Sequence, residues 1–225
     1  MFSPISDTWL LAEALRSQIV SPATKVLDIC TGSGALAVTA ALRGAQDVTA
    51  VDVSRRAVLT ARVNARLNGV RVRGVRSDLF SALGDERYDV IVSNPPYVPA
   101  ETDALPGRGP QRAWDAGRDG RILLDRILAE APARLRPGGV LLIVHSEVCG
   151  IDATLDAMRG GGLDAGVVVR HRGPLGPLMR ERVEHLEGQG LLAPGRREEE
   201  VVVLRGRAPE LEARRARRAP QPAYS

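Results

Sequence analysis

The sequence contains few aromatic residues, few cysteines and almost no lysine. Phenylalanine, tryptophan and tyrosine make up 3% of the 225 residues, although the apolar content as a whole, 44%, is ordinary for a globular protein. The two cysteines, Cys30 and Cys149, lie far apart and indicate no disulfide framework. Cysteine and histidine are nowhere grouped at the spacing of metal ligands, so we predict no bound metal.

Long apolar runs are also missing. No segment approaches the roughly 20 apolar residues that a transmembrane helix needs. The first residues do not show the basic stretch followed by an apolar stretch that marks a signal peptide. These absences predict a soluble, cytoplasmic protein that does not contact a membrane.

The positive charge is concentrated at the end of the chain. The formal net charge is +4, and 30 of the 31 basic residues are arginine. From Arg205 onward there are six arginines and two glutamates, so this segment contributes 6 − 2 = +4 and residues 1–204 sum to zero. A nucleic-acid enzyme more often has a basic folded domain, so the neutral sum argues against that class. It does not exclude a local basic patch.

Short apolar segments alternate with segments of helical periodicity along most of the chain. Strands are predicted at 25–29, 47–51, 70–75, 88–92, 140–144, 165–169 and 200–204, and helices at 8–19, 35–43, 54–67, 120–135 and 151–159. Ser6 or Asp7 is expected to cap the first helix, and Ser54 the third. The order predicts an α/β fold, a mostly parallel seven-stranded sheet with helices on both faces. We expect residues 1–207 to form one domain, and the Arg-rich segment 208–225 to be a disordered tail.

A glycine-rich loop follows the first predicted strand. Gly32 and Gly34 allow tight turns and a close approach of the backbone to a ligand. A nicotinamide dinucleotide site is one alternative, because the spacing of Gly32, Gly34 and Ala37 fits that fingerprint. Asp28 stands before the glycines, where it would repel a pyrophosphate but attract a positively charged amino-acid group. A turn without any ligand is the other alternative.

Two more carboxylates follow the next strands. Asp52 ends the second strand, where a carboxylate accepts hydrogen bonds from both ribose hydroxyls of an adenosine. Asp78 follows the third strand, where it is placed to accept from the exocyclic amine of adenine. Taken alone, Asp52 or Asp78 is explained equally well as a loop carboxylate or a helix cap. In open α/β sheets the carboxyl ends of the strands form the ligand site, so together with the glycine loop they indicate an adenosine site.

The most specific motif is Asn94-Pro95-Pro96-Tyr97, at the end of the fourth strand. The two prolines fix φ and make the loop stiff. The Asn94 side-chain oxygen and the Pro95 carbonyl offer two acceptors to a planar NH2 group, and Tyr97 is expected to stack on that group. Holding both hydrogens directs the nitrogen lone pair at a methyl donor, so catalysis would be mainly positioning.

Four segments, DICTGSG, VDVS, SDLF and SNPPYVP, occur in this order and spacing. They resemble the HemK-like family of class I S-adenosylmethionine (SAM)-dependent methyltransferases, which includes enzymes that methylate glutamine in peptide release factors. The resemblance covers roughly residues 1–170 and implies a Rossmann-like fold with an antiparallel last strand. The start, with Asp7-Thr8, resembles the short branch that lacks an N-terminal helical domain. The segment 114–120 resembles the substrate-side loop, whereas 171–197 matches nothing in the family.

The resemblance implies a set of site residues. Those expected to contact SAM, or its product S-adenosylhomocysteine, are Thr8, Asp28, Cys30, Gly32, Gly34, Asp52, Val53, Asp78, Leu79 and Asn94, and those expected to hold the target nitrogen are Asn94, Pro95, Pro96 and Tyr97. Cys30 departs from the family, where many members carry glycine. Trp114 is a candidate substrate contact or an anchor of the loop. His145, at the end of the fifth strand, is a weaker candidate and more often a structural histidine.

The resulting hypothesis is a SAM-dependent N-methyltransferase acting on a planar NH2 group. A glutamine amide on a protein, such as a release factor, is the leading acceptor. A small-molecule amine or amide and adenine N6 in nucleic acid remain alternatives, the last of which would require base flipping. A SAM-binding regulatory subunit without catalysis is the alternative from another class. The sequence does not decide whether a partner subunit is needed.

Overall fold

The computed structural model describes residues 6–18 and 21–210, so most of the predicted tail lies outside the described residues. The strands are β1 (Lys25–Ile29), β2 (Asp47–Asp52), β3 (Arg73–Arg76), β4 (Tyr88–Ser93), β5 (Leu135–Ser146), β6 (Asp164–Pro174) and β7 (Glu198–Arg207). The α-helices are α1 (Ser6–Arg16), α2 (Ala35–Leu42), α3 (Arg55–Leu67), α4 (Ile122–Arg134), α5 (Ile151–Gly160), α6 (Pro177–Glu181) and α7 (Val183–Gly188). Two short 3-10 helices are η1 (Pro110–Ala113) and η2 (Glu147–Cys149).

All seven strands form one sheet in the order β3-β2-β1-β4-β5-β7-β6. Strands β1 to β5 run parallel to one another, and β7 runs antiparallel to both β5 and β6. The predicted fold class is therefore confirmed, including the antiparallel last strand. From β1 the chain winds outward to β3 and then returns to place β4 on the other side of β1. This reversal is the topological switch point, where such sheets bind ligands at the carboxyl ends of the strands.

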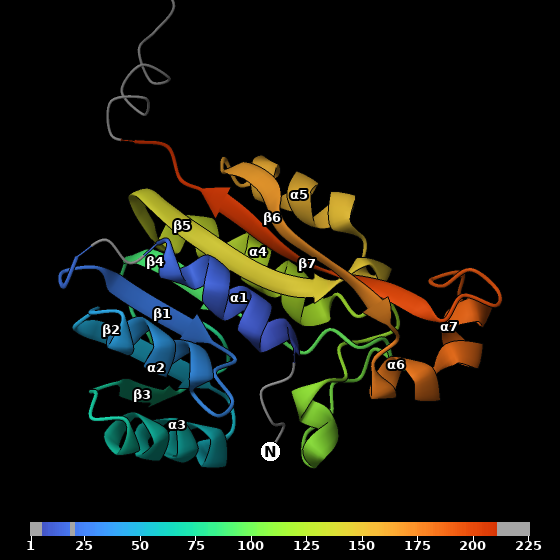
Figure 1. Cartoon of the computed structure of the whole chain (residues 1–225), viewed down its shortest axis with the longest axis horizontal. Coiled ribbons are helices and arrows are strands. Elements are labelled where there is room, and N and C mark those ends of the chain that lie inside the picture. Colours follow the sequence, from blue (N-terminus) through green and yellow to red (C-terminus); the bar gives the residue numbers. More distant parts are fainter. Residues whose placement is uncertain (1–5, 19–20, 211–225) are drawn as a thin grey trace, which may run out of the picture.

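The sheet is covered on both faces. Helices α1, α2 and α3 lie on one face, and α4 and α5 lie on the other (Figure 1). Successive residues of the central strands enter different cores, because side chains alternate across a strand. Val90 and Val92 of β4 belong to the core under α1 to α3, whereas Ile91 belongs to the core under α4 and α5. Burial on both faces explains why these strands are apolar without alternation.

Several boundaries differ from the prediction. The first helix begins at Ser6, so Ser6 and Asp7 both lie in its first turn, and neither is the residue before the helix where the predicted cap would stand. The Asp7 carboxylate accepts from the Tyr97 hydroxyl. The predicted cap at Ser54 is confirmed, since its Oγ accepts from the Ala57 amide at 3.4 Å. Pro137, Gly138 and Gly139 are residues typical of a turn, yet they are part of β5, which pairs with β7 over the following residues. The unmatched segment after residue 171 ends β6 and then forms α6 and α7.

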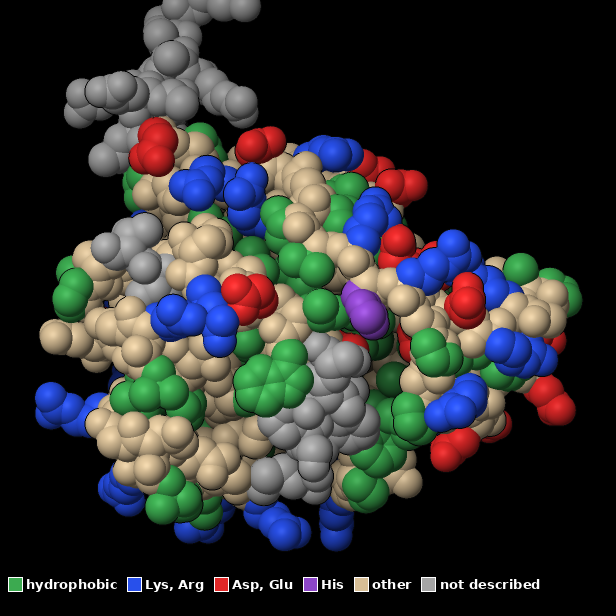
Figure 2. All heavy atoms as spheres, in the orientation of Figure 1, with side chains coloured by type: hydrophobic (Ala, Val, Ile, Leu, Met, Phe, Trp, Pro, Cys, Tyr) green, Lys and Arg blue, Asp and Glu red, His purple; other side chains and the backbone are tan. Residues whose placement is uncertain are grey.

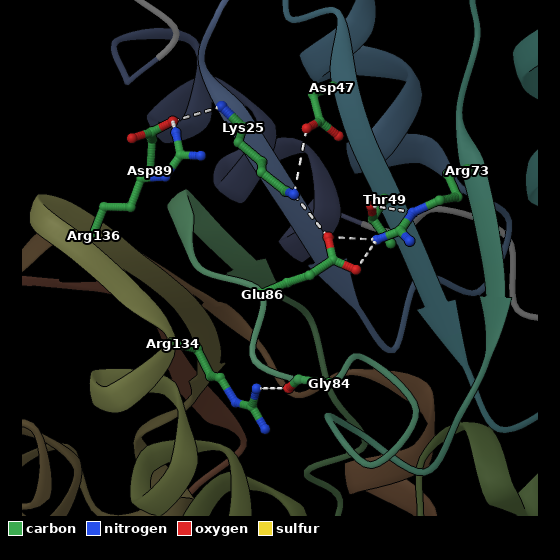
Figure 3. Close-up of polar contacts among 9 residues, drawn as sticks. All are labelled: Lys25, Asp47, Thr49, Arg73, Gly84, Glu86, Asp89, Arg134 and Arg136. Carbon is green, nitrogen blue, oxygen red and sulfur yellow. Dashed lines mark hydrogen bonds and ion pairs between the residues drawn. The ribbon is translucent and has the colours of Figure 1, made fainter.

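A network of ion pairs and hydrogen bonds connects the strands at their amino ends, the edge of the sheet opposite the switch point (Figure 3). Lys25 Nζ lies 2.7 Å from Glu86 and 3.5 Å from Asp47. Arg73 binds the same Glu86 carboxylate at 2.7 Å and donates to Thr49 at 3.1 Å. The network therefore links β1, β2 and β3 to the turn before β4.

Among the described residues, no helix is both long and apolar enough to cross a membrane.

Candidate active site

A cavity of about 810 Å³ opens at the carboxyl ends of β1 to β4. Its walls come from the start of α1, the glycine loop, the ends of β2 and β3, the start of α3, the Asn-Pro-Pro-Tyr loop and residues 108–114, together with Leu123 of α4 and Leu178 of α6. The predicted site residues that line it are Thr8, Cys30, Gly32, Asp52, Val53, Asp78, Leu79, Asn94, Pro95, Pro96, Tyr97 and Trp114. Asp28, Gly34 and His145 do not line it.

The glycine loop forms the floor of the cavity. Cys30, Gly32 and Gly34 have φ angles of 59°, 54° and 83°, the left-handed region that glycine adopts without strain. Gly34 has a second constraint, because a Cβ there would lie 2.7 Å from Ala61 of α3. Cys30 adopts the glycine conformation with a side chain, which explains physically why glycine suits this position. Burial and the nearby Asp52 raise the pKa of the Cys30 thiol, so it stays protonated.

Asp28 holds the loop together from beneath. Its carboxylate is 1% exposed and accepts from Thr31 Oγ1 at 2.5 Å and from the Ala37 amide at 3.0 Å. Burial raises the pKa of Asp28 from its ordinary 3.8 to about 7, although both hydrogen bonds oppose the shift. Its role in the described structure is to order the loop, one layer behind the cavity wall.

Asp52 and Asp78 face the cavity from adjacent strand ends. The two oxygens of Asp52 accept from the Gly32 amide at 3.0 Å and the Ser54 amide at 2.8 Å, which fixes the carboxylate across the loop. Each oxygen keeps a second lone pair for a ligand hydroxyl. Asp78 is paired with Arg126 of α4 at 2.9 Å. Leu79, the next residue, has a φ of 49°; its side chain is buried and lines the cavity.

The start of α1 holds both polar side chains of the Asn-Pro-Pro-Tyr loop. Asn94 Nδ2 donates to Thr8 Oγ1 at 3.0 Å, and the Tyr97 hydroxyl donates to the buried Asp7 carboxylate. Burial and the Asp7 charge raise the pKa of Tyr97, so it stays protonated. The Tyr97 carbonyl lies so close to Gly120 that a Cβ there would approach it to 2.3 Å. The loop is thus fixed from two sides.

Residues 98–118 fold back on themselves over the cavity. The Val98 amide donates to Trp114 O at 2.8 Å, and the Ala116 amide donates to Val98 O at 3.1 Å. The Arg182 side chain joins these two segments. Its guanidinium group donates to Pro99 O at 2.6 Å and forms an ion pair with Asp115, also at 2.6 Å. His185 of α7 contacts the Ala100 carbonyl oxygen at 3.1 Å. The segment that matched nothing in the sequence analysis therefore supports the rim, and Leu178 of α6 lines the cavity itself.

His145 is buried outside the cavity. Its Nδ1 lies 2.8 Å from Ser146 O, and burial lowers the pKa of His145 from 6.5 to about 4. This geometry fits the structural alternative. Three residues that the sequence analysis did not single out for the site now belong to it: Asp7 as the acceptor of Tyr97, Arg126 as the partner of Asp78, and Arg182. No local spacing marks them, because their partners are more than 40 positions away.

Known proteins resemble the chain in the same regions. The family model of the methyltransferase small domain matches residues 6–105. A Methanocaldococcus jannaschii protein, named as a candidate protein N5-glutamine methyltransferase, is 34% identical over 80% of this chain and 89% of its own length. The chain belongs to the HemK-like family of methyltransferases. A release factor glutamine methyltransferase of Bordetella pertussis is 45% identical, over 63% of this methyltransferase and only 55% of the relative's length.

Solved structures share the fold of this methyltransferase. The Thermus thermophilus 16S rRNA methyltransferase RsmC, solved with AdoMet and guanosine, has a TM-score of 0.61 at 23% identity, covering 92% of this chain and 44% of that one. The E. cuniculi Mtq2–Trm112 complex, described as methylating the translation termination factor eRF1, has a TM-score of 0.59 at 23% identity, covering 92% and 98%. Both support the Rossmann-like methyltransferase fold.

Proposed function

We propose that this methyltransferase transfers a methyl group from SAM to the side-chain amide nitrogen of a glutamine in a protein. The observation that carries the proposal is the orientation of Asn94. Because its Nδ2 donates to Thr8, its Oδ1 is the atom left to accept a hydrogen bond from a substrate. Within the described residues no hydrogen bond uses the Pro95 carbonyl oxygen, so a planar NH2 group would find a second acceptor beside the first.

The cavity residues fit SAM. Asp52, already held by two amides, would accept from the ribose hydroxyls, and Asp78 from the adenine amine. Ile29, Val51 and Leu79 supply apolar walls for the adenine ring. Bound SAM supplies an electrophilic methyl group on a positively charged sulfur. The residues expected from the family to contact it, Thr8, Cys30, Gly32, Val53 and Asn94, line the same cavity.

The chain itself positions the acceptor and provides no strong base. The raised pKa values of Cys30 and Tyr97 keep both groups neutral at pH 7. Asn94 and Pro95 would instead hold the two N–H groups, which orients the nitrogen lone pair, while Tyr97 forms the wall beside them. Orientation of this kind lowers a barrier by fixing the reacting atoms in place. The proton leaves after charge has developed on nitrogen.

The relatives support a protein acceptor. Their names specify glutamine in release factors and in ribosomal protein uL3. The identity of the acceptor and a cytoplasmic location stay predictions. Small-molecule amides and adenine offer a planar NH2 group too, so the acceptor has to be measured.

Two measurements test the proposal. Calorimetry should show binding of SAM and none of NAD; tight NAD binding would contradict the cofactor assignment. Transfer of tritiated methyl groups should label a release factor or ribosomal protein at glutamine, and leave DNA and a metabolite extract unlabelled. Asn94→Ala should lower the transfer rate at least 100-fold, or about 2.7 kcal/mol, while SAM still binds. Unchanged transfer by Asn94→Ala would refute the catalytic assignment.

A further inference from the structure

A strongly basic face covers α3 and β3. Between Asp52 and Asp78 the chain carries seven arginines and no acidic residue. All seven are exposed, and we call them the arginine surface: Arg55, Arg56, Arg62, Arg66, Arg71, Arg73 and Arg76. Figure 2 shows blue side chains along the lower left margin, below the position of α3 in Figure 1, with no red side chain beside them. The neutral sum of residues 1–204 therefore conceals a local excess of positive charge.

Most of this charge is not neutralised within the described part of the chain. Arg73 alone of the seven forms an ion pair there, with Glu86 at 2.7 Å. Arg76 donates to the Val53 carbonyl, which leaves its charge uncompensated. In the opposite half of the molecule, by contrast, six arginines pair with carboxylates: Arg159, Arg170, Arg172, Arg182, Arg196 and Arg197. Six guanidinium groups of the arginine surface are thus available to an external anion.

The arginine surface is continuous with the mouth of the active-site cavity. Arg56, at the start of α3, lines the cavity as well as belonging to the surface. Arg108 and Arg112 of the overlying loop line the same cavity. An anion bound along α3 would therefore extend to the mouth of the cavity, where the acceptor enters.

We propose that the arginine surface binds the phosphate backbone of RNA. Guanidinium groups bind phosphate through paired hydrogen bonds, and nucleic-acid interfaces are much more positive than protein–protein interfaces. No aromatic residue lies between Asp52 and Asp78, so the face has no platform for stacking bases. The recognition is therefore of backbone and not of sequence.

The competing occupant is an acidic protein. Leu59, Val63 and Leu67 form an exposed aliphatic row on α3, with exposed fractions of 49%, 50% and 79%, and such a row would suit a protein interface. Six arginines that form no ion pair within the described part of the chain outweigh these three side chains, which favours the polyanion. If the proposed function holds, the arginine surface would retain the enzyme on RNA-associated acceptor proteins. RNA binding itself requires neither SAM nor an acceptor.

Fluorescence anisotropy with a labelled RNA hairpin of mixed sequence tests the proposal over a series of KCl concentrations. The full chain should bind, with affinity falling steeply as salt rises. The double variant Arg66→Glu/Arg71→Glu should bind at least tenfold more weakly at low salt. A plot of the logarithm of the association constant against the logarithm of the KCl concentration should also become less steep. Its slope should fall in magnitude by about 2, one for each lost phosphate contact. A hairpin of another sequence should bind equally.

The matched control is Arg172→Glu/Arg180→Glu, which changes the net charge equally at exposed positions of β6 and α6. It should keep wild-type RNA affinity, because it leaves the arginine surface intact. Both double variants retain the same C-terminal arginines, so those residues cannot account for a difference between them. Equal losses in the two double variants would show a mere net-charge effect and overturn the proposal. So would failure of the full chain to bind RNA while it binds poly-L-glutamate, which would indicate an acidic protein partner. Methyl transfer to an RNA-free acceptor should be unchanged in Arg66→Glu/Arg71→Glu, so the failure of the proposed function would be seen separately.

Discussion

At the scale of single residues, the contact between Thr8 and Asn94 determines which atom of the Asn94 amide faces the acceptor. Thr8→Val removes that contact and keeps the shape of the side chain. Since a hydrogen bond of this kind contributes about 1 kcal/mol, we expect a five- to tenfold lower rate of methyl transfer at saturating SAM. Single-turnover kinetics measure this step directly.

Two comparisons make the Thr8 prediction specific. Thr8→Ser should restore most of the rate, because it restores the hydroxyl. Thr60→Val removes another threonine hydroxyl, which donates to Arg56 O on α3, and should have no effect on the rate. A wild-type rate in Thr8→Val would show that Asn94 does not depend on Thr8.

Asp28 gives the protein a characteristic dependence on pH. Its pKa is about 7 in the folded chain and 3.8 in an ordinary environment, so the native state binds this proton more tightly than the unfolded state does. The contribution of Asp28 to the free energy of unfolding is therefore largest below pH 3.8 and declines as pH rises to about 7. Asp28→Asn keeps an acceptor for Thr31 and Ala37 and removes the ionisation.

We therefore expect Asp28→Asn to gain stability relative to wild type as pH rises from 4 to 7, by about 1.4 kcal/mol for each unit of pKa difference. Urea unfolding at a series of pH values measures it. Asp164→Asn, at an exposed position, should show no such trend. If the difference in free energy of unfolding between Asp28→Asn and wild type were the same at every pH, the pKa of Asp28 would be ordinary and the prediction would be wrong.

At the scale of elements, Arg182, between α6 and α7, makes two of the contacts that fix the rim of the cavity. Arg182 joins Pro99 O to the Asp115 carboxylate, which is only 16% exposed. Arg182→Ala leaves both groups unpaired, which loosens the loop that faces the acceptor. We expect the KM for the acceptor to rise at least tenfold, with an unchanged Kd for SAM measured by calorimetry.

Two variants control the Arg182 experiment. Arg182→Lys supplies a point charge without the fork of two donors, so it should recover only part of the loss. Arg180→Ala removes an exposed arginine two positions away and should change neither constant. If Arg182→Ala altered only stability and left the acceptor KM unchanged, the rim would not depend on α6 and α7.

The elements also show what could be predicted from the sequence. Asp52 ends a strand, and Asp78 and Asn94 come just after the ends of two others. Parallel strands bring their carboxyl ends to one edge, so the meeting of these residues in one cavity follows from the order of elements. The extent of β5 could not be predicted, because Pro137 and the following glycines indicate a turn by themselves. The position of Arg182 could not be predicted either, since it depends on how β6 and β7 are joined.

At the scale of the whole molecule, the charge network around Glu86 stabilises the sheet far from the cavity. Lys25 and Arg73 lower the pKa of Glu86 from its ordinary 4.5. Because the folded-state pKa is depressed, the stabilisation is present at neutral pH and is lost as pH falls below about 4.5. Glu86→Gln should lower the free energy of unfolding at pH 7 by about 1 to 2 kcal/mol and leave the rate of methyl transfer unchanged.

Chemical denaturation at pH 7 and pH 4 measures this contribution. Glu130→Gln, at an exposed position of α4, serves as the control and should change stability little. The deficit of Glu86→Gln should shrink at the lower pH. A deficit that grew on acidification would contradict the network.

The contacts that complete the cavity differ in how far apart they lie along the chain. Asp28 meets Thr31 and Ala37 at separations of 3 and 9 positions, and Gly32 meets Asp52 at 20. The Asn-Pro-Pro-Tyr loop meets α1 at 86 and 90 positions, and Arg182 meets Pro99 at 83. Since closing longer loops is slower, the nucleotide half of the site is the one that early folding can build. On the ribosome, the contacts of α1 with the Asn-Pro-Pro-Tyr loop can form once residue 97 has emerged, whereas the contacts of Arg182 with Pro99 and Asp115 have to wait for residue 182. The rim that faces the acceptor is therefore the last part of the site to be completed.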